Sequence, residues 1–313
     1  MMDSSHDVPP ELADELALEP GCGSGLCNPV CLNPAACNSP WGRYVAVRIG
    51  LAYSGPVIPV LGQARCLSDP RSERTVGNAL RDKTVVVVGR GSGIARAVAL
   101  LAQSEGARVV VAGRDRAALQ SAYSGSDITA ESVDITDDES IAALADRLGA
   151  VDHVVSTASA RARGNLVDLD RHKLRLSFDT KVIGPTMLAK YCAPQIKPNG
   201  SFVLFSGVHA FKLNVGYLGV GITNGAVDFL ARWLAVELAP TRVNAISPGV
   251  IDTGAWDSLG GDGKRDYFRH IADRNPVGRI GTTADVAGAA LFAMTNTFMT
   301  GMTLKVDGGE PLV

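Results

Sequence analysis

Three closely spaced glycines follow an apolar segment near residue 90 and have the spacing of a phosphate-binding turn. Residues 84–95 read TVVVVGRGSGIA, with the glycines at positions 89, 91 and 93. Glycine lets backbone N–H groups approach an anion closely, and a helix that begins after the turn directs its positive end at the same anion. An ordinary strand-to-helix connection is the alternative interpretation, because such a turn is a weak signal by itself. The residues that would contact the pyrophosphate of a dinucleotide are Gly89, Arg90, Gly91, Ser92, Gly93 and Ile94.

Short apolar segments alternate with longer amphipathic ones around this turn. The run of four valines is typical of a parallel strand that is buried on both faces. Thr136 with Glu139, and Thr282 with Asp285, have the spacing of capping boxes that begin helices. The pattern predicts an α/β fold, with one doubly wound Rossmann-type domain over residues 81–313 and a mostly parallel seven-stranded sheet. The expected strands are 84–88, 108–112, 132–134, 151–155, 201–205, 242–246 and 302–306, and the expected helices are 94–104, 116–123, 136–148, 170–193, 220–238 and 282–294.

Residues 1–80 differ from the rest of the chain in composition. The first twenty residues contain acidic side chains and no Lys or Arg, and the next twenty are rich in Gly, Asn, Pro and Cys. This composition predicts an irregular or disordered N-terminal extension, to which we assign no function. The four cysteines between residues 22 and 37 do not have the spacing of zinc or iron–sulfur ligands, so we expect no metal site.

Composition also limits the classes of function. A chain of 313 residues that is 46% hydrophobic can bury a full core, and a formal net charge of −2 argues against nucleic-acid binding. No segment has the character of a transmembrane span or of a signal peptide, so no membrane partner is expected. Cys192 is the one cysteine after residue 66, which favours a cytoplasmic protein.

Several landmarks resemble those of the short-chain dehydrogenase/reductase family, in the family's order. The glycine turn resembles the motif Thr-Gly-x-x-x-Gly-Ile-Gly, with Val and Ala at its first and last positions. Ser156–Ser159 is a looser match to the Asn-Asn-Ala-Gly segment that follows the fourth strand. Arg242–Gly249 matches the segment that lies over the nicotinamide, and Val306–Gly309 matches the family's ending. The resemblance implies a nicotinamide cofactor that is bound, beyond the glycine turn, by Asp134, Ile135, Ala158, Pro248, Gly249 and Thr253.

The position that distinguishes the two nicotinamide dinucleotides carries no acidic residue. NAD-selective enzymes place a carboxylate about 20 positions after the glycine motif, where it accepts a hydrogen bond from the ribose 2′-OH. Gly113 stands there, and Arg114 follows it. A guanidinium can bind a 2′-phosphate through two hydrogen bonds, and Arg90 offers a second positive charge. We therefore predict NADP(H) as the cofactor; the alternative is that both arginines are solvated surface residues.

The residues that usually transfer the proton in this family are replaced. The resemblance implies a Tyr acid, a Ser that orients the substrate carbonyl, a Lys that lowers the pKa of the Tyr, and an Asn that supports the Lys. The corresponding residues in this chain, in the same order, are Val220, Gly207, Asn224 and Lys181.

Two of these replacements look reciprocal, because lysine and asparagine have exchanged positions. We hypothesise that Lys181 supplies the cation near the nicotinamide ribose and that Asn224 is its polar partner. Independent drift at an inactive site explains the exchange equally well. His209 and Tyr217, which follow the fifth expected strand, are alternative proton donors, although each is also compatible with a structural role.

These observations predict an NADP(H)-dependent oxidoreductase of the short-chain type that acts on a small carbonyl or alcohol substrate. The family resemblance implies a homodimer or homotetramer. A catalytically silent nucleotide-binding module is one alternative, because the four usual catalytic residues are missing. A reductase of C=C or C=N bonds with the same cofactor is another, because such bonds do not require the serine that orients a carbonyl. Residues 254–271, with Trp256, Tyr267 and Phe268, are expected to cover the substrate.

Overall fold

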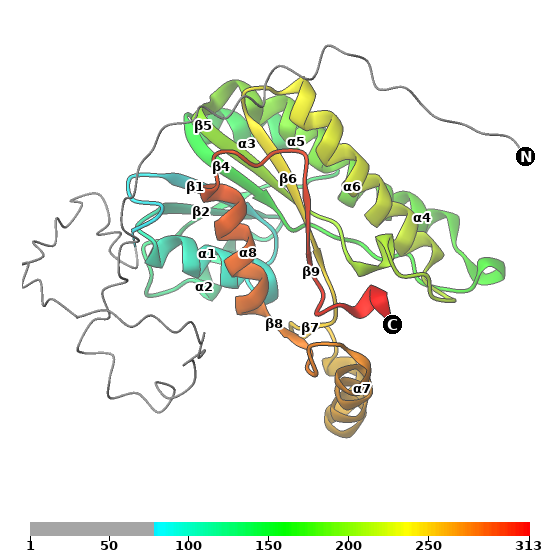
Figure 1. The fold of residues 1–313 in the computed structure, drawn as a ribbon. Helices are drawn as coiled ribbons and strands as arrows, with labels where there is room; N and C mark the ends of the chain where they lie inside the picture. Colours follow the sequence, from blue (N-terminus) through cyan, green and yellow to red (C-terminus); the bar gives the residue numbers. More distant parts are fainter. Residues whose placement is uncertain (1–77) are drawn as a thin grey trace, which may run out of the picture. The chain divides into compact units, whose positions relative to one another are not determined.

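The protein, described over residues 78–313 by a computed structural model, has a central sheet between two groups of helices (Figure 1). Every strand pairing in this sheet is parallel, and the order is β3-β2-β1-β4-β5-β6-β9. This order confirms the predicted doubly wound α/β fold with seven strands, and its direction reverses between β1 and β4. The strands are β1 Thr84–Val88, β2 Arg108–Gly113, β3 Thr129–Ser132, β4 Val151–Ser156, β5 Ile196–Phe205, β6 Arg242–Pro248 and β9 Thr303–Val306, with a separate pair formed by β7 Ile251–Asp252 and β8 Gly281–Thr282.

One group of helices covers each face of the sheet (Figure 1). Alternate valines of β1 point to opposite faces, so Val85 and Val87 join the core under α1, α2 and α8, whereas Val86 and Val88 join the core under α3, α5 and α6. The four side chains are at most 2% exposed, which explains why the segment reads as a continuous apolar run. The helices are α1 Gly93–Ser104, α2 Arg116–Ala122, α3 Asp138–Leu148, α4 Arg171–Phe178, α5 Gly184–Cys192, α6 Leu218–Glu237, α7 Gly260–Arg274 and α8 Thr283–Thr295.

The third strand was predicted at the wrong residues. It runs over Thr129–Ser132 rather than 132–134, because Ala130 is the buried residue of a short strand at the sheet edge and Asp134 already belongs to the following turn. The described part of the chain begins just before the predicted boundary at residue 81, and Leu80 is buried in the core. The rest of the predicted N-terminal extension, with its five cysteines, lies outside the described residues. Within residues 78–313, none of the helices has the length and apolar character that crossing a membrane requires.

One of the two predicted helix caps also differs from the structure. Helix α3 is capped by Asp137, which accepts a hydrogen bond from the Glu139 N–H, and not by Thr136. Thr136 is engaged elsewhere, because its N–H and its hydroxyl both donate to Oδ1 of Asp134, at 3.0 and 2.7 Å. A carboxylate is the stronger acceptor and holds the threonine in the preceding turn. The capping box that begins α8 at Thr282 is present as predicted.

The carboxyl ends of four strands bring the predicted site segments to one edge of the sheet. The glycine turn follows β1, residues 157–163 follow β4, residues 206–209 follow β5, and residues 248–253 lie at the end of β6. In open parallel sheets, ligands bind in the crevice at this edge, where the strand order reverses.

Candidate active site

The glycines of the turn between β1 and α1 pack so closely against their neighbours that no other residue fits there. A Cβ atom at Gly89 would lie 2.1 Å from Oγ1 of Thr157, and one at Gly91 would lie 2.6 Å from Cβ of Ala122. Gly93 has φ of +58°, a conformation that favours glycine. The N-cap residue of α1, Ser92, makes no side-chain hydrogen bond to the helix, and the first turn has no acidic residue. The N–H groups at this helix end can therefore bind a phosphate group.

The end of β2 explains why no acidic residue follows the glycine motif at the expected distance. A Cβ atom at Gly113 would lie 2.7 Å from the carbonyl oxygen of Gly89, so any side chain there would collide with the backbone of the glycine turn. Arg114 and Arg90 are both exposed. Two hydrogen bonds from Thr136 hold the pKa of Asp134 below its usual range, and the charge of Arg114 contributes to the same direction.

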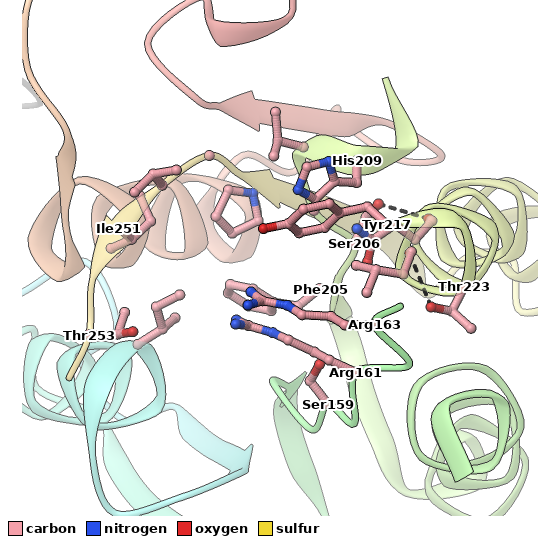
Figure 2. A pocket seen from close by; sticks show the side chains of 18 of the residues that line it. Ser159, Arg161, Arg163, Phe205, Ser206, His209, Tyr217, Thr223, Ile251 and Thr253 are labelled. Atoms are coloured by element: carbon pink, nitrogen blue, oxygen red, sulfur yellow. Dashed lines mark hydrogen bonds between the residues drawn. The ribbon is translucent and has the colours of Figure 1, made fainter. Parts of the chain in front are cut away.

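A cavity of about 200 Å³ continues from the glycine turn towards the ends of β5 and β6 (Figure 2). Thr253 joins the two regions, because a Cβ atom at Gly93 would lie 3.2 Å from Cβ of Thr253. Ile94, Pro248 and Gly249 also line the cavity. Of the other residues predicted to bind the cofactor, Ala158 packs on the core beside the end of β4, and Ile135 is buried beyond β3.

Lys181 reaches the cavity from a helical turn of unusual geometry. It belongs to Asp179–Ile183, a π-helical turn between α4 and α5, and such turns are frequent at functional sites. Its side chain is 8% exposed, and its ammonium donates a hydrogen bond of 2.9 Å to the carbonyl oxygen of Ser206. Burial, with a smaller contribution from the charge of Arg161, lowers the pKa of Lys181 to about 7. Lys181 is thus a group in the cavity wall that can exchange a proton near neutral pH.

Asn224 lies near Lys181 without a direct hydrogen bond to it. The predicted pairing is replaced by a path through Ser206, whose carbonyl accepts from Lys181 and whose hydroxyl donates to the backbone carbonyl of Asn224 at 2.8 Å. The Asn224 side chain instead occupies the space beside Gly207, where a Cβ atom would lie 2.8 Å from its Nδ2. The asparagine thus takes the volume that a side chain at position 207 would use, and the residues at positions 207 and 224 are sterically coupled.

The two alternative proton donors stack on each other. The rings of His209 and Tyr217 have centroids 4.0 Å apart, and both residues line the cavity (Figure 2). Nδ1 of His209 lies 3.3 Å from the carbonyl oxygen of Lys212. Burial lowers the pKa of His209, although the hydrogen bond with this carbonyl acts in the opposite direction.

The segment predicted to cover the substrate lies over one end of the cavity. Trp256 packs on Tyr267 of α7 with ring centroids 4.8 Å apart, and its indole N–H donates to the carbonyl oxygen of Ile251. Trp256 and Tyr267 line the cavity, whereas Phe268 packs behind them at 6.5 Å from the Trp256 ring. The sequence interpretation missed two other cavity residues, Arg161 and Arg163, although their place directly after β4 was a usable signal.

Comparison with known proteins identifies the family. Residues 88–310 match the family model described as enoyl-(acyl carrier protein) reductase. The chain is 31% identical over 253 residues to a short-chain dehydrogenase/reductase of an Acremonium species, and the alignment covers 74% of this chain and 96% of that protein. The chain belongs to the short-chain dehydrogenase/reductase family. This match confirms the family that the sequence resemblance predicted.

Two further short-chain relatives bear on the activity. The chain is 31% identical over 247 residues to a 2-keto-3-deoxy-L-fuconate dehydrogenase of Xanthomonas campestris, with 75% of this chain and 82% of that protein covered. A solved structure of a small-chain dehydrogenase in complex with NADPH is 33% identical and has a TM-score of 0.65, with 74% of this chain and 99% of that chain covered. As a member of this family the protein is an oxidoreductase that uses a nicotinamide cofactor.

Proposed function

We propose that the protein is an NADP(H)-dependent oxidoreductase that acts on a small carbonyl or alcohol substrate, with Lys181 as its proton donor. The observation that carries this proposal is the glycine turn, whose helix N-terminus has no side-chain cap and adjoins a cavity with Lys181 in its wall. The NADPH complex of a related structure and the name of the Xanthomonas relative support the cofactor and the substrate class. The buried lysine in the cavity wall favours this function over an inert nucleotide-binding module.

In this proposal, one set of residues binds the cofactor and Lys181 transfers the proton. The glycine turn and the N-terminus of α1 would hold the pyrophosphate, and Arg114 and Arg90 would bind the 2′-phosphate. When bound, the cofactor would supply or accept the hydride. The Lys181 ammonium gives a proton to the carbonyl oxygen of the substrate as the carbonyl carbon is reduced, and solvent then reprotonates the amine. A pKa of about 7 lets the same group accept the proton during oxidation.

Cofactor titration followed by a substrate panel tests this function. NADPH and NADH are titrated by fluorescence, and NADPH consumption is then followed over ketones, imines and enones. We expect NADPH to bind more tightly than NADH and to be consumed with at least one class of carbonyl compound. Failure to bind either nucleotide would overturn the cofactor assignment, and tight binding without turnover would favour the inert module.

Arg114→Ser is expected to raise the dissociation constant of NADPH by about tenfold and to change that of NADH by less than threefold. The substitution removes a charge-assisted contact with the 2′-phosphate, which NADH lacks. Both constants are measured by the same fluorescence titration. Arg175→Ser, on the exposed face of α4, is the matched control and should change neither constant. Equal weakening of both nucleotides by Arg114→Ser would contradict the assignment.

Reduction of C=C bonds is the second candidate function. Its support is the enoyl reductase description of the matching family model, together with Gly207, which has no hydroxyl to orient a carbonyl. Analysis of the enone products distinguishes the two candidates. A saturated ketone as product would favour C=C reduction, whereas an allylic alcohol would favour the carbonyl reductase.

We also propose that a second copy of the chain contacts α6. Phe229, Trp233 and Val236 are 55–74% exposed and lie at helical spacing on one side of this helix. Trp233→Glu is therefore expected to lower the mass measured in solution by light scattering. A monomeric mass for the wild type as well as for Trp233→Glu would contradict the proposed homo-oligomer.

A further inference from the structure

Two arginines enter the cavity from the segment that follows β4. Arg161 and Arg163 alternate with Ala162, so their side chains leave the backbone on the same side, and Figure 2 shows both guanidinium groups directed into the cavity side by side. Both residues are exposed to solvent. The surrounding protein nevertheless lowers the pKa of Arg161 by desolvation, and the adjacent charge of Arg163 lowers it further. Two like charges thus lie side by side at the cavity.

The backbone that carries these arginines is fixed by its neighbours. Ala162 is fully buried, and a Cβ atom at Gly219 of α6 would lie 2.7 Å from its carbonyl oxygen. The buried hydroxyl of Ser177 donates a hydrogen bond of 2.8 Å to the carbonyl oxygen of Ala160. The position of the two side chains therefore follows from close packing against α4 and α6 and does not need a ligand to create it.

No carboxylate neutralises this pair in the part of the chain that the structure describes. Neither guanidinium has an ion-pair partner among residues 78–313. The charged groups that act on the pKa of Arg161 are arginines and tyrosines. The one acidic side chain in the cavity lining is Glu310, which is 6% exposed and whose pKa is raised by burial. With Lys181 also present, the cavity has an excess of positive charge.

Aromatic rings orient one member of the pair. The guanidinium carbon of Arg163 lies 5.1 Å from the centroid of Tyr217 and 5.6 Å from that of Trp256. Cation–π contacts of this kind hold the group without using its N–H donors. The N–H groups remain free to form paired hydrogen bonds with an oxyanion, and the same rings offer apolar surface to the rest of a small molecule.

We infer that the substrate is a small carbonyl or hydroxy acid, whose carboxylate is bound by Arg161 and Arg163 while its reacting carbon faces Lys181. This inference rests on the proposed oxidoreductase function and specifies its substrate class. The other source of an anion is a cofactor phosphate, and the test separates the two.

The first experiment compares acids with their neutral esters as substrates. Oxo acids of four to eight carbons, and their methyl esters, are supplied with saturating NADPH. We expect kcat/KM to be about 10–100 times higher for the preferred acid than for its ester, because hydrogen bonds between charged groups account for differences of this size. Equal values for acid and ester, or turnover of esters alone, would overturn the substrate class while the oxidoreductase function stood.

Arginine variants then locate the anion. Arg161→Gln and Arg163→Gln should each lower kcat/KM for the acid by about 10–100-fold, with less than threefold change for the ester and for NADPH binding. Arg163→Lys should recover part of the loss, and Arg175→Gln on α4 should have no effect. Unchanged use of the acid by both variants would overturn the inference. Weaker NADPH binding in these variants would also overturn it, because the arginines would then bind the cofactor.

A binding measurement keeps the inference testable if no substrate is turned over. Benzoate, with benzamide as the neutral control, is titrated into the protein–NADPH complex by calorimetry. Binding of benzoate that both arginine variants lose would support the anion site even where the oxidoreductase function had failed. Equal affinity for benzoate and benzamide, or absence of benzoate binding, would refute the anion site.

Discussion

Lys181→Met should lower the rate of carbonyl reduction by about 10²–10⁴-fold and leave the dissociation constant of NADPH within about threefold. Methionine has nearly the length of lysine but has no proton to donate, and the contacts that we propose for the pyrophosphate and the 2′-phosphate do not involve Lys181. Steady-state turnover and fluorescence titration measure the two quantities. Lys190→Met, at an exposed position of α5, is the matched control and should change neither. Unchanged turnover in Lys181→Met would contradict the role of Lys181.

The pH profile tests the same role through proton transfer. Because burial lowers the pKa of Lys181 to about 7, reduction should slow as pH rises through 7, and oxidation should accelerate. Among the other titratable groups at the cavity, burial lowers the pKa of His209 and raises those of Tyr267 and Glu310. The range from about pH 6 to about pH 9 extends one unit below this pKa and two units above it. A reduction rate that does not change over this range would contradict the assignment.

Loss of activity in Lys181→Met should not come from unfolding. The pKa of Lys181 is about 7 in the folded protein, whereas that of an exposed lysine is 10.5, so folding disfavours the ammonium. Below pH 7 Lys181 is charged in both states, so the folded protein carries the full cost of burying the ammonium. This cost to the free energy of unfolding shrinks as pH rises from 7 towards 10.5, because the folded state then loses its proton first. Methionine removes this cost, and the variant should melt at the same or a higher temperature than the wild type at pH 6.

Gly113→Asp is expected to destabilise the protein by about 1–3 kcal/mol and to weaken binding of both nucleotides more than tenfold. Although aspartate here would imitate the acidic residue of NAD-selective enzymes, its Cβ would lie 2.7 Å from the carbonyl oxygen of Gly89 and would displace the glycine turn. Urea denaturation and fluorescence titration measure the two effects. Gly288→Asp is the control, because this exposed glycine of α8 has no neighbour within 4 Å of an added Cβ. A stable Gly113→Asp protein that prefers NADH would contradict the steric argument.

The architecture could be predicted because it depends on local patterns. Three helices and strands each follow from a short stretch of sequence: β1 from the continuous valine run, the start of α1 from the spacing of the glycines, and the start of α8 from the capping box at Thr282. Prediction failed where two local choices compete, as in the turn at Asp134 whose carboxylate takes the donors of Thr136 from the helix cap. The third strand was misplaced for a related reason, because an edge strand of four residues has too little pattern to fix its position.

The chemistry of the site depends on contacts between distant segments and was less predictable. The exchange of lysine and asparagine was a hypothesis drawn from the family resemblance, and it stays a hypothesis. That Lys181 would donate to Ser206, and that Asn224 would fill the space beside Gly207, follows from how α6 packs on the end of β5. Arg161 was overlooked because the absence of a carboxylate partner cannot be seen until the surrounding elements are assembled.

NADPH consumption by the wild-type protein is the most direct test of an active site with a displaced proton donor. The protein is saturated with NADPH and offered the panel of ketones, oxo acids, imines and enones at pH 6.5, about half a unit below the pKa of Lys181, so that this group is mostly protonated. The account predicts steady consumption with an oxo acid that Lys181→Met abolishes. Tight NADPH binding with no consumption on any member of the panel would contradict it.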